Sequence, residues 1–202
     1  MYHFQYVSKN EIASLKNQVI EMIGLVQDEI RNCFTFQYEF IGSVKLNMVT
    51  CDVKSNIGFD FDVNITVNDD DEEYSAKDIK QILMKAFNKY AYKYHYDFCE
   101  DSTRVFTIKV KDRKNSRILY SCDFAIVNNY GDNLQEYIRF NKKSNSYNWT
   151  EQSDWFYLLP EKIEFCKDNS LWTEVREIYI EKKNCNKDKN KKSRSIFADA
   201  IH

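Results

Sequence analysis

Two aspartates stand one residue apart in the segment FDFDVNITV, which begins at residue 59. Alternate side chains of a strand point to opposite faces, so Asp60 and Asp62 would share one face, and the aromatic and β-branched residues the other. Their Cα atoms would then lie about 7 Å apart, close enough for both carboxylates to bind the same metal ions. Ionised carboxylates repel each other, and a divalent cation removes that repulsion. The spacing therefore predicts a site for one or two divalent cations.

A third acid, Asp123, lies in the segment SCDFAIVNN, where it alternates with apolar residues as in a strand with one buried face. Asp60, Asp62 and Asp123 could together form a cluster of three carboxylates. Hard oxygen ligands of this kind suit Mg²⁺ or Mn²⁺, and phosphoryl or nucleotidyl transfer is the chemistry that most often uses them. The alternative is that all three are merely the polar, solvated side of a sheet.

The segment FIGSVK, which precedes the aspartate pair, contains residue types that suit a bound phosphate. Gly42 lets the backbone approach a phosphate closely, Ser43 offers a hydroxyl and an amide, and Lys45 offers a point charge. Taken alone, Ser43 and Lys45 are more typical of a turn and of a protein surface than of a phosphate site. Their position before the aspartate strand favours a nucleotide-binding role.

The elements that must position these residues are predicted by hydrophobic periodicity and capping. Ser8 and Ser75 each stand at the start of an amphipathic pattern with an acid three residues later, which predicts helices over 8–32 and from 75 to about 94. An extended segment before a turn at Gly42 and Ser43, and strands at 56–67, 104–112 and 117–129, are predicted from β-branched and aromatic runs. The last two strands read as a hairpin.

Beyond residue 130 the pattern weakens. We expect a polar, loop-like stretch with one short strand near 137–140, and a helix near 170–183. The predicted organisation is a core α/β lobe over 1–130 and a short, partly helical C-terminal extension over 131–202. The chain of 202 residues is long enough to bury a substantial core.

The composition sets limits on partners and location. A net charge of −2 gives no overall attraction to nucleic acid or membrane, and the six scattered cysteines form no CxxC pair. No apolar span is long enough to cross a membrane. We therefore expect a cytoplasmic protein with reduced thiols and no membrane partner.

The order of IGS (41–43), FDFDV (59–63) and CDFAI (122–126) resembles the nucleotidyltransferase superfamily with a DNA polymerase β-like fold. Lys45 and Thr50, which follow Gly-Ser, look somewhat like the branch of oligoadenylate synthases and cyclic-dinucleotide synthases. The resemblance implies an α+β fold, with a mixed or antiparallel sheet packed on helices. It covers roughly residues 8–130.

The resemblance also implies an activity and residue roles. Gly42 and Ser43 would hold the phosphates of a nucleoside triphosphate, while Asp60 and Asp62 would ligate Mg²⁺ or Mn²⁺. Asp123 would ligate the catalytic metal and help activate the attacking hydroxyl. The reaction would be attack of an acceptor hydroxyl on the α-phosphate, with release of pyrophosphate. The acceptor could be RNA, a protein, a second nucleotide or a small molecule.

Two other functions remain open. Sixteen residues separate Ser43 from Asp60, and the C-terminal part is short, which suits a catalytically inactive binding protein on the same fold, either antitoxin-like or a regulatory partner. A metal-dependent nuclease is a weaker alternative, since a lysine or glutamate base at a short spacing from an acid is missing.

The basic run KKNCNKDKNKKSR, residues 182–194, has two interpretations. It reads as a solvated connection between elements. Alternatively, Lys182 or Lys183, on the last turn of the preceding helix, faces the triphosphate, and the rest of the run contacts an RNA or another polyanion.

Overall fold

The structure is a computed structural model that describes residues 2–55, 58–69, 71–130, 134–152, 159–188 and 190–202. The chain divides into two compact units. Residues 7–49 and 58–152 form one, which we call the sheet unit, and residues 1–6, 50–57 and 153–202 form the other, the helical unit. The domain boundary predicted at residue 130 stays a prediction.

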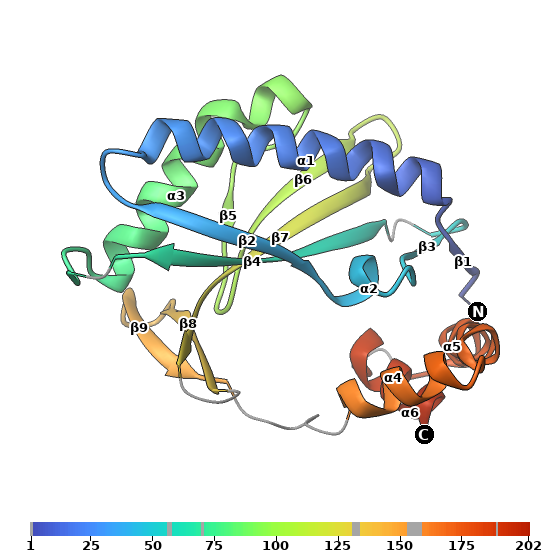
Figure 1. The fold of residues 1–202 in the computed structure, drawn as a ribbon. Coiled ribbons are helices and arrows are strands. Elements are labelled where there is room, and N and C mark those ends of the chain that lie inside the picture. The colour runs from blue at the N-terminus through green and yellow to red at the C-terminus, as the bar shows by residue number, and fades with distance from the viewer. Residues whose placement is uncertain (1, 56–57, 70, 131–133, 153–158, 189) are drawn as a thin grey trace. The chain divides into compact units, whose positions relative to one another are not determined.

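A mixed β-sheet is the centre of the sheet unit (Figure 1). Its strands are β2 (Thr35–Ile41), β4 (Phe59–Asn68), β5 (Glu100–Asp101), β6 (Phe106–Asp112), β7 (Arg117–Tyr130), β8 (Leu134–Asn141) and β9 (Ser146–Glu151). The strand order is β2-β4-β7-β6-β5, while β8 pairs with β7 and β9 pairs with β8. The central pair β4 and β7 is parallel, and the pairs around it are antiparallel.

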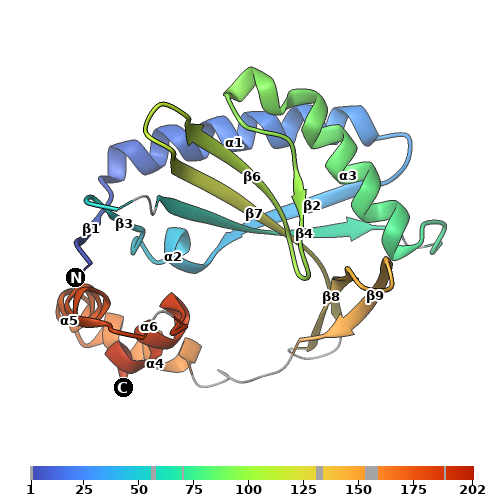
Figure 2. The same cartoon turned by 180° about the vertical axis from the view of Figure 1, so that it is seen from behind.

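Two long helices, α1 (Lys9–Ile30) and α3 (Ala76–Ala91), lie on the same side of this sheet (Figures 1 and 2). Ser8 caps α1 through its side chain, and Ser75 and Asp78 form the predicted capping box of α3. From Val19 on, α1 buries one face at helical spacing, namely Val19, Met22, Ile23, Val26 and Ile30. Both helices therefore begin where the sequence predicts and pack by one apolar stripe.

The strand face beneath the helices carries the aromatic core. Phe61 on β4 and Phe124 on β7 are fully buried, and the ring of Phe87 on α3 lies 4.4 Å from that of Phe124. Phe106 on β6 stacks on Phe124 at 5.0 Å. Strand alternation places the residues between these aromatics on the other face of the sheet. The core thus fixes which side chains of β4 and β7 face away from the helices.

Two short elements adjoin the sheet: α2 (Gly42–Lys45), which directly follows β2, and the 3₁₀ turn η1 (Tyr92–Tyr94), which follows α3. The predicted turn at Gly42 and Ser43 is thus the first part of a single helical turn. The segment that joins α2 to β4 contains β3 (Thr50–Asp52), which belongs to the helical unit.

The helical unit consists of α4 (Leu159–Asp168), α5 (Trp172–Cys185) and α6 (Ser193–Ile201), together with β1 (Phe4–Tyr6) and its antiparallel partner β3. The amide of Asn184 on α5 bonds both backbone groups of Phe4, at 2.6 and 3.1 Å. Phe197 on α6 meets the rings of Trp172 and Tyr179 edge-on. This unit joins the first and last parts of the chain.

The α+β class agrees with the sequence-based prediction, and so do helices α1 and α3 and strands β2, β4, β6 and β7. The short strands β1, β3 and β5 were not predicted. The prediction of a loop-like stretch after 130 was wrong in part, because β8 and β9 form a hairpin that continues the sheet. Helices α4 and α6 were also not predicted. Helix α6 has no side-chain N-cap, so the signal that marks the start of α1 and α3 is missing there.

Candidate active site

The parallel pair β4 and β7 brings two of the predicted acids side by side. Asp62 and Asp123 are register partners, and Asp60 is the partner of Ser121 two residues earlier. Neighbouring strands lie about 4.8 Å apart, and register partners of a parallel pair point to the same face. Because Phe61 and Phe124 occupy the helix-covered face, all three acids lie on the opposite one. We call this face, with Asp60, Asp62 and Asp123, the acid face.

Two hydroxyl groups on the acid face donate hydrogen bonds to the acids. Thr107 on β6, the register partner of Asp123, donates from Oγ1 to Oδ1 of that carboxylate at 2.6 Å. Ser121 donates from Oγ to Oδ1 of Asp60. Both donors are buried, whereas Asp60 is exposed and the other two acids are half-buried.

Gly42 lies directly against Asp62. Ile41, the last residue of β2, is the register partner of Asp62, so the chain enters α2 beside this carboxylate. Gly42 has a φ of +62°, and a Cβ atom built on it would lie only 2.7 Å from Oδ2 of Asp62. Both the left-handed backbone and the nearness of the carboxylate therefore require glycine. The structure thus brings Gly42 and the adjoining Ser43 to the acid face.

The electrostatics of the acid face are those of crowded carboxylates. Burial raises the pKa of Asp62 to about 6, and the charges of Asp123 and Asp60 add to the shift. Burial also raises the pKa of Asp123, as does the charge of Asp60, while the bond from Thr107 and the charge of Lys109 oppose the rise. A bound cation would offset this repulsion and lower the pKa values of the acids, because it favours their ionised forms.

The donor chemistry of the acid face fits a hard divalent cation. Among the residues that the structure describes, no group of three or more histidine, cysteine, aspartate or glutamate side chains could hold a metal ion. Mg²⁺, however, is commonly held by one or two carboxylates together with substrate phosphates. Asp62 and Asp123 are register partners on one face of the sheet, so two carboxylates are available for such a site. The three-carboxylate cluster stays a prediction.

Lys45, predicted to bind nucleotide, lies at the end of α2. Its Nζ is 2.5 Å from Oε1 of Glu39 on β2, and both side chains are largely exposed. An exposed pair of this kind contributes little to stability, so a bound phosphate could compete for the ammonium group. Its nucleotide contact stays a prediction.

Lys182 and Lys183, also predicted to bind nucleotide, belong to α5 of the helical unit. Lys182 is exposed. Lys183 is buried, donates from Nζ to Oγ1 of Thr50 at 2.7 Å, and lies over the ring of Phe4 at 4.0 Å. The side chain of Lys183 thus packs inside its own unit. Its place in a basic run of the sequence does not indicate this. Their predicted contacts to phosphate stay predictions.

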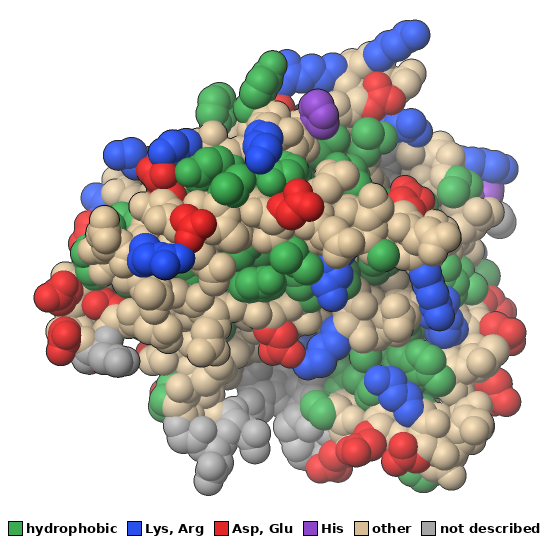
Figure 3. Space-filling model, turned by 45° about the horizontal axis from the view of Figure 1, so that its top comes forward, with side chains coloured by type: hydrophobic (Ala, Val, Ile, Leu, Met, Phe, Trp, Pro, Cys, Tyr) green, Lys and Arg blue, Asp and Glu red, His purple; other side chains and the backbone are tan. Residues whose placement is uncertain are grey.

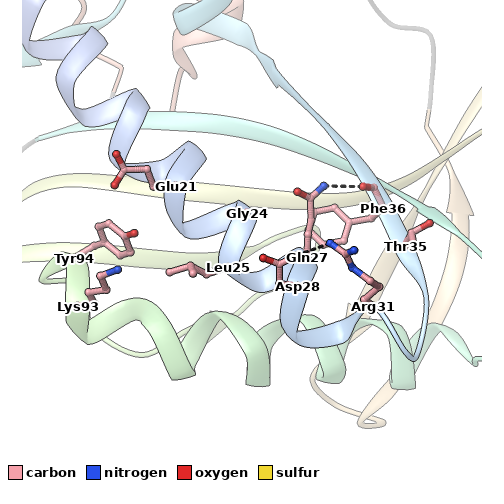
Figure 4. Close-up of a pocket in the computed structure, with 10 residues that line it drawn as sticks. All are labelled: Glu21, Gly24, Leu25, Gln27, Asp28, Arg31, Thr35, Phe36, Lys93 and Tyr94. Carbon is pink, nitrogen blue, oxygen red and sulfur yellow. Dashed lines mark hydrogen bonds and ion pairs between the residues drawn. The ribbon is translucent and has the colours of Figure 1, made fainter.

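A separate pocket of about 730 Å³ lies on the helix side of the sheet unit (Figure 4). It is lined by α1, the start of β2 and the turn η1, and includes two acids and two bases, namely Glu21, Asp28, Arg31 and Lys93. Their formal charges cancel, so this lining does not favour a triphosphate. Acidic and basic side chains are likewise interspersed over the face shown in Figure 3.

Comparison with known proteins shows what the fold is similar to. No protein-family model and no curated protein sequence matches the chain. Solved structures do match, and they are structures of cyclic dinucleotide synthases. The fold expected from the sequence resemblance is thereby confirmed.

The STING-associated CdnE c-di-GMP synthase of Capnocytophaga granulosa matches with a TM-score of 0.60 and 18% identity, over 98% of this chain and 61% of that chain. The Vibrio cholerae DncV cyclic AMP-GMP synthase also gives 0.60, with 8% identity over 86% of this chain and 60% of that one. The CdnE cyclic dinucleotide synthase of Elizabethkingia meningoseptica, with GTP and Apcpp, gives 0.54 and 12% identity, over 97% and 75%. The chain thus spans about 60% of the length of the first two structures.

Some residues of the acid face were not identified from the sequence. Thr107 and Ser121 lie 16 and 61 residues from the acids they bond, so their bonds become visible only when strand register is known. Alternation along β7 could have indicated that Ser121 faces the same side as Asp123. Separately, none of the described helices has the length and apolarity needed to cross a membrane.

Proposed function

We propose that the chain is a divalent-metal-dependent nucleotidyltransferase that transfers a nucleoside monophosphate from a nucleoside triphosphate to an acceptor hydroxyl. The observation that carries the proposal is the register pairing of Asp62 with Asp123. Gly42 lies beside this pair, so close to Asp62 that a side chain would not fit. The fold shared with nucleotide synthases supports it, and so does the presence of GTP and Apcpp in one of those structures.

Each residue of the acid face has a role in this proposal. Asp60 and Asp62 would hold Mg²⁺ or Mn²⁺, which when bound would neutralise charge on the phosphates. Gly42 and Ser43 would receive the phosphates next to that site, and Lys45 would leave Glu39 to contact them. Asp123 would also bind the cation and would help remove the proton of the acceptor hydroxyl. As the new bond to the α-phosphorus forms, the bond to the bridging oxygen breaks and pyrophosphate leaves.

The neighbours guide the choice of acceptor for a first assay. Because those proteins are cyclic dinucleotide synthases, we infer that a second nucleoside triphosphate is the acceptor to test before RNA, protein or a small molecule. Such substrates belong to the cytoplasm, which is where we place the protein.

The test follows label from α-³²P-labelled triphosphates, singly and in pairs, with Mg²⁺ or Mn²⁺. We expect labelled product and pyrophosphate from the wild type, and loss of both in the double variant D60N/D62N with its fold retained by circular dichroism. The variant D28N, which removes a carboxylate from the exposed part of α1, is the control and should keep full activity. The wild type contradicts the proposal if it neither transfers label nor binds any of the four triphosphates in a metal-dependent way.

A catalytically inactive binding protein is the second candidate. It is favoured by the lack of a three-ligand metal group among the described residues, and by the sixteen residues that separate Ser43 from Asp60. In that case a partner captured by the wild type should bind D60N/D62N equally well, although no triphosphate is turned over. Loss of that binding in the double variant would count against this candidate.

A further inference from the structure

We propose that Thr107 and Ser121 are positioning residues, which hold the carboxylates of Asp123 and Asp60 in the orientation that receives the cation. The inference rests on the proposed function, since it assigns a task to side chains around the same site. Neither residue would touch the nucleotide or the reacting atoms.

The two hydroxyls occupy equivalent places on adjacent strands. Thr107 on β6 is the register partner of Asp123 on β7, and Ser121 on β7 is the register partner of Asp60 on β4. Each hydroxyl donates to the Oδ1 atom of the acid opposite to it. In both cases one carboxylate oxygen is held by the next strand, and the other oxygen, Oδ2, is the one we assign to the cation.

Burial makes the two donors well suited to this task. Thr107 is 9% exposed and Ser121 is 5% exposed, so both hydroxyl groups need a protein partner. Asp60, by contrast, is exposed, and water could satisfy both of its oxygens. The bond from Ser121 therefore serves mainly to orient the Asp60 carboxylate, since water could take its place as a hydrogen-bond donor.

The nearby lysine, Lys109, does not hold either carboxylate by a direct bond. Lys109 is the register partner of Ser121 on β6, but its Nζ forms an ion pair with Glu100 of β5. The direct bonds from the described residues to Asp60 and Asp123 thus come from neutral hydroxyls. A neutral donor orients a carboxylate without cancelling the charge that attracts a divalent cation.

The test measures Mn²⁺ binding directly, by the electron paramagnetic resonance signal of free Mn²⁺, in the absence of nucleotide. Loss of a group that orients a metal ligand typically weakens metal affinity about tenfold or more. We expect T107V and S121A each to raise the dissociation constant for Mn²⁺ about tenfold. T107S, which keeps the hydroxyl, should restore wild-type binding and also guards against a folding defect in T107V.

The matched control is T66V, which replaces a threonine on the same face of β4, four residues beyond Asp62, and should leave the dissociation constant unchanged. If the wild type binds Mn²⁺ but T107V and S121A bind it equally well, the inference is overturned and the proposed function stands. If the wild type and D60N/D62N show the same absence of binding, the metal site itself fails, and the inference fails with it.

Discussion

Replacement of Gly42 by alanine tests whether the turn into α2 and the Asp62 carboxylate form one unit. The φ of +62° costs an alanine roughly 1–2 kcal/mol relative to glycine. The new Cβ would also lie 2.7 Å from Oδ2 of Asp62, whereas ordinary contact begins near 3.4 Å. The carboxylate or the turn must therefore move by several tenths of an ångström.

The consequence for activity follows from that displacement. A shift approaching 1 Å in a group that positions substrate can lower the rate about 100-fold. We expect G42A to lower kcat/KM for label transfer by about that factor, and to lower the free energy of unfolding in urea by about 1–2 kcal/mol. The activity loss should exceed what partial unfolding explains.

Gly24 offers a matched control for this experiment. It lies inside α1, and a Cβ built on it meets nothing within 4 Å. G24A should therefore raise helix stability by up to about 1 kcal/mol and leave activity unchanged. Activity of G42A within about threefold of the wild type, at equal folded fraction, would refute the link between Gly42 and Asp62.

Three further predictions concern the sheet unit. Burial and the neighbouring acids raise the pKa of Asp62 to about 6, above the unfolded value near 4, so its carboxyl binds protons more tightly in the native state. The free energy of unfolding in EDTA should therefore fall by about 2 kcal/mol as pH rises from 4 to 6, and D62N should lack this fall. K80M should cost about 3 kcal/mol in urea unfolding, because Lys80 is buried and pairs with Asp101 at 2.7 Å, and D101N added to it should recover part of the loss. K45M should raise KM for the triphosphate about tenfold. It should change the free energy of unfolding by less than about 0.5 kcal/mol, because the ion pair of Lys45 with Glu39 is exposed. E39Q, which frees Lys45, should leave KM unchanged or lower it.

Local signals account for the parts of the fold that were predicted. The capping box at Ser75 and Asp78 and the apolar stripe of α1 are encoded within a few turns of helix. The alternation in β4 likewise places Phe61 and Asp62 on opposite faces without reference to other strands. Such features depend on spacing along the chain, which the sequence contains.

Features that depend on pairing between distant segments were not predicted. β3 lies between α2 and β4 in the chain but pairs with β1, more than forty residues earlier. The ammonium group of Lys183 lies over the ring of Phe4, although the residue lies in a run of lysines. The hydroxyls of Thr107 and Ser121 reach their acids only because β4, β7 and β6 align in one register. These relations follow from tertiary structure rather than from local pattern.

The central claim is that the acid face binds a divalent cation together with a nucleoside triphosphate. A crystal of the chain grown with Mn²⁺ and a non-hydrolysable triphosphate analogue, measured at the manganese absorption edge, tests it most directly. We predict an anomalous peak bonded to Asp60, Asp62 and Asp123, with the phosphates beside Gly42 and Ser43. An unchanged fold with bound analogue elsewhere, and no peak at the acid face, would contradict the account.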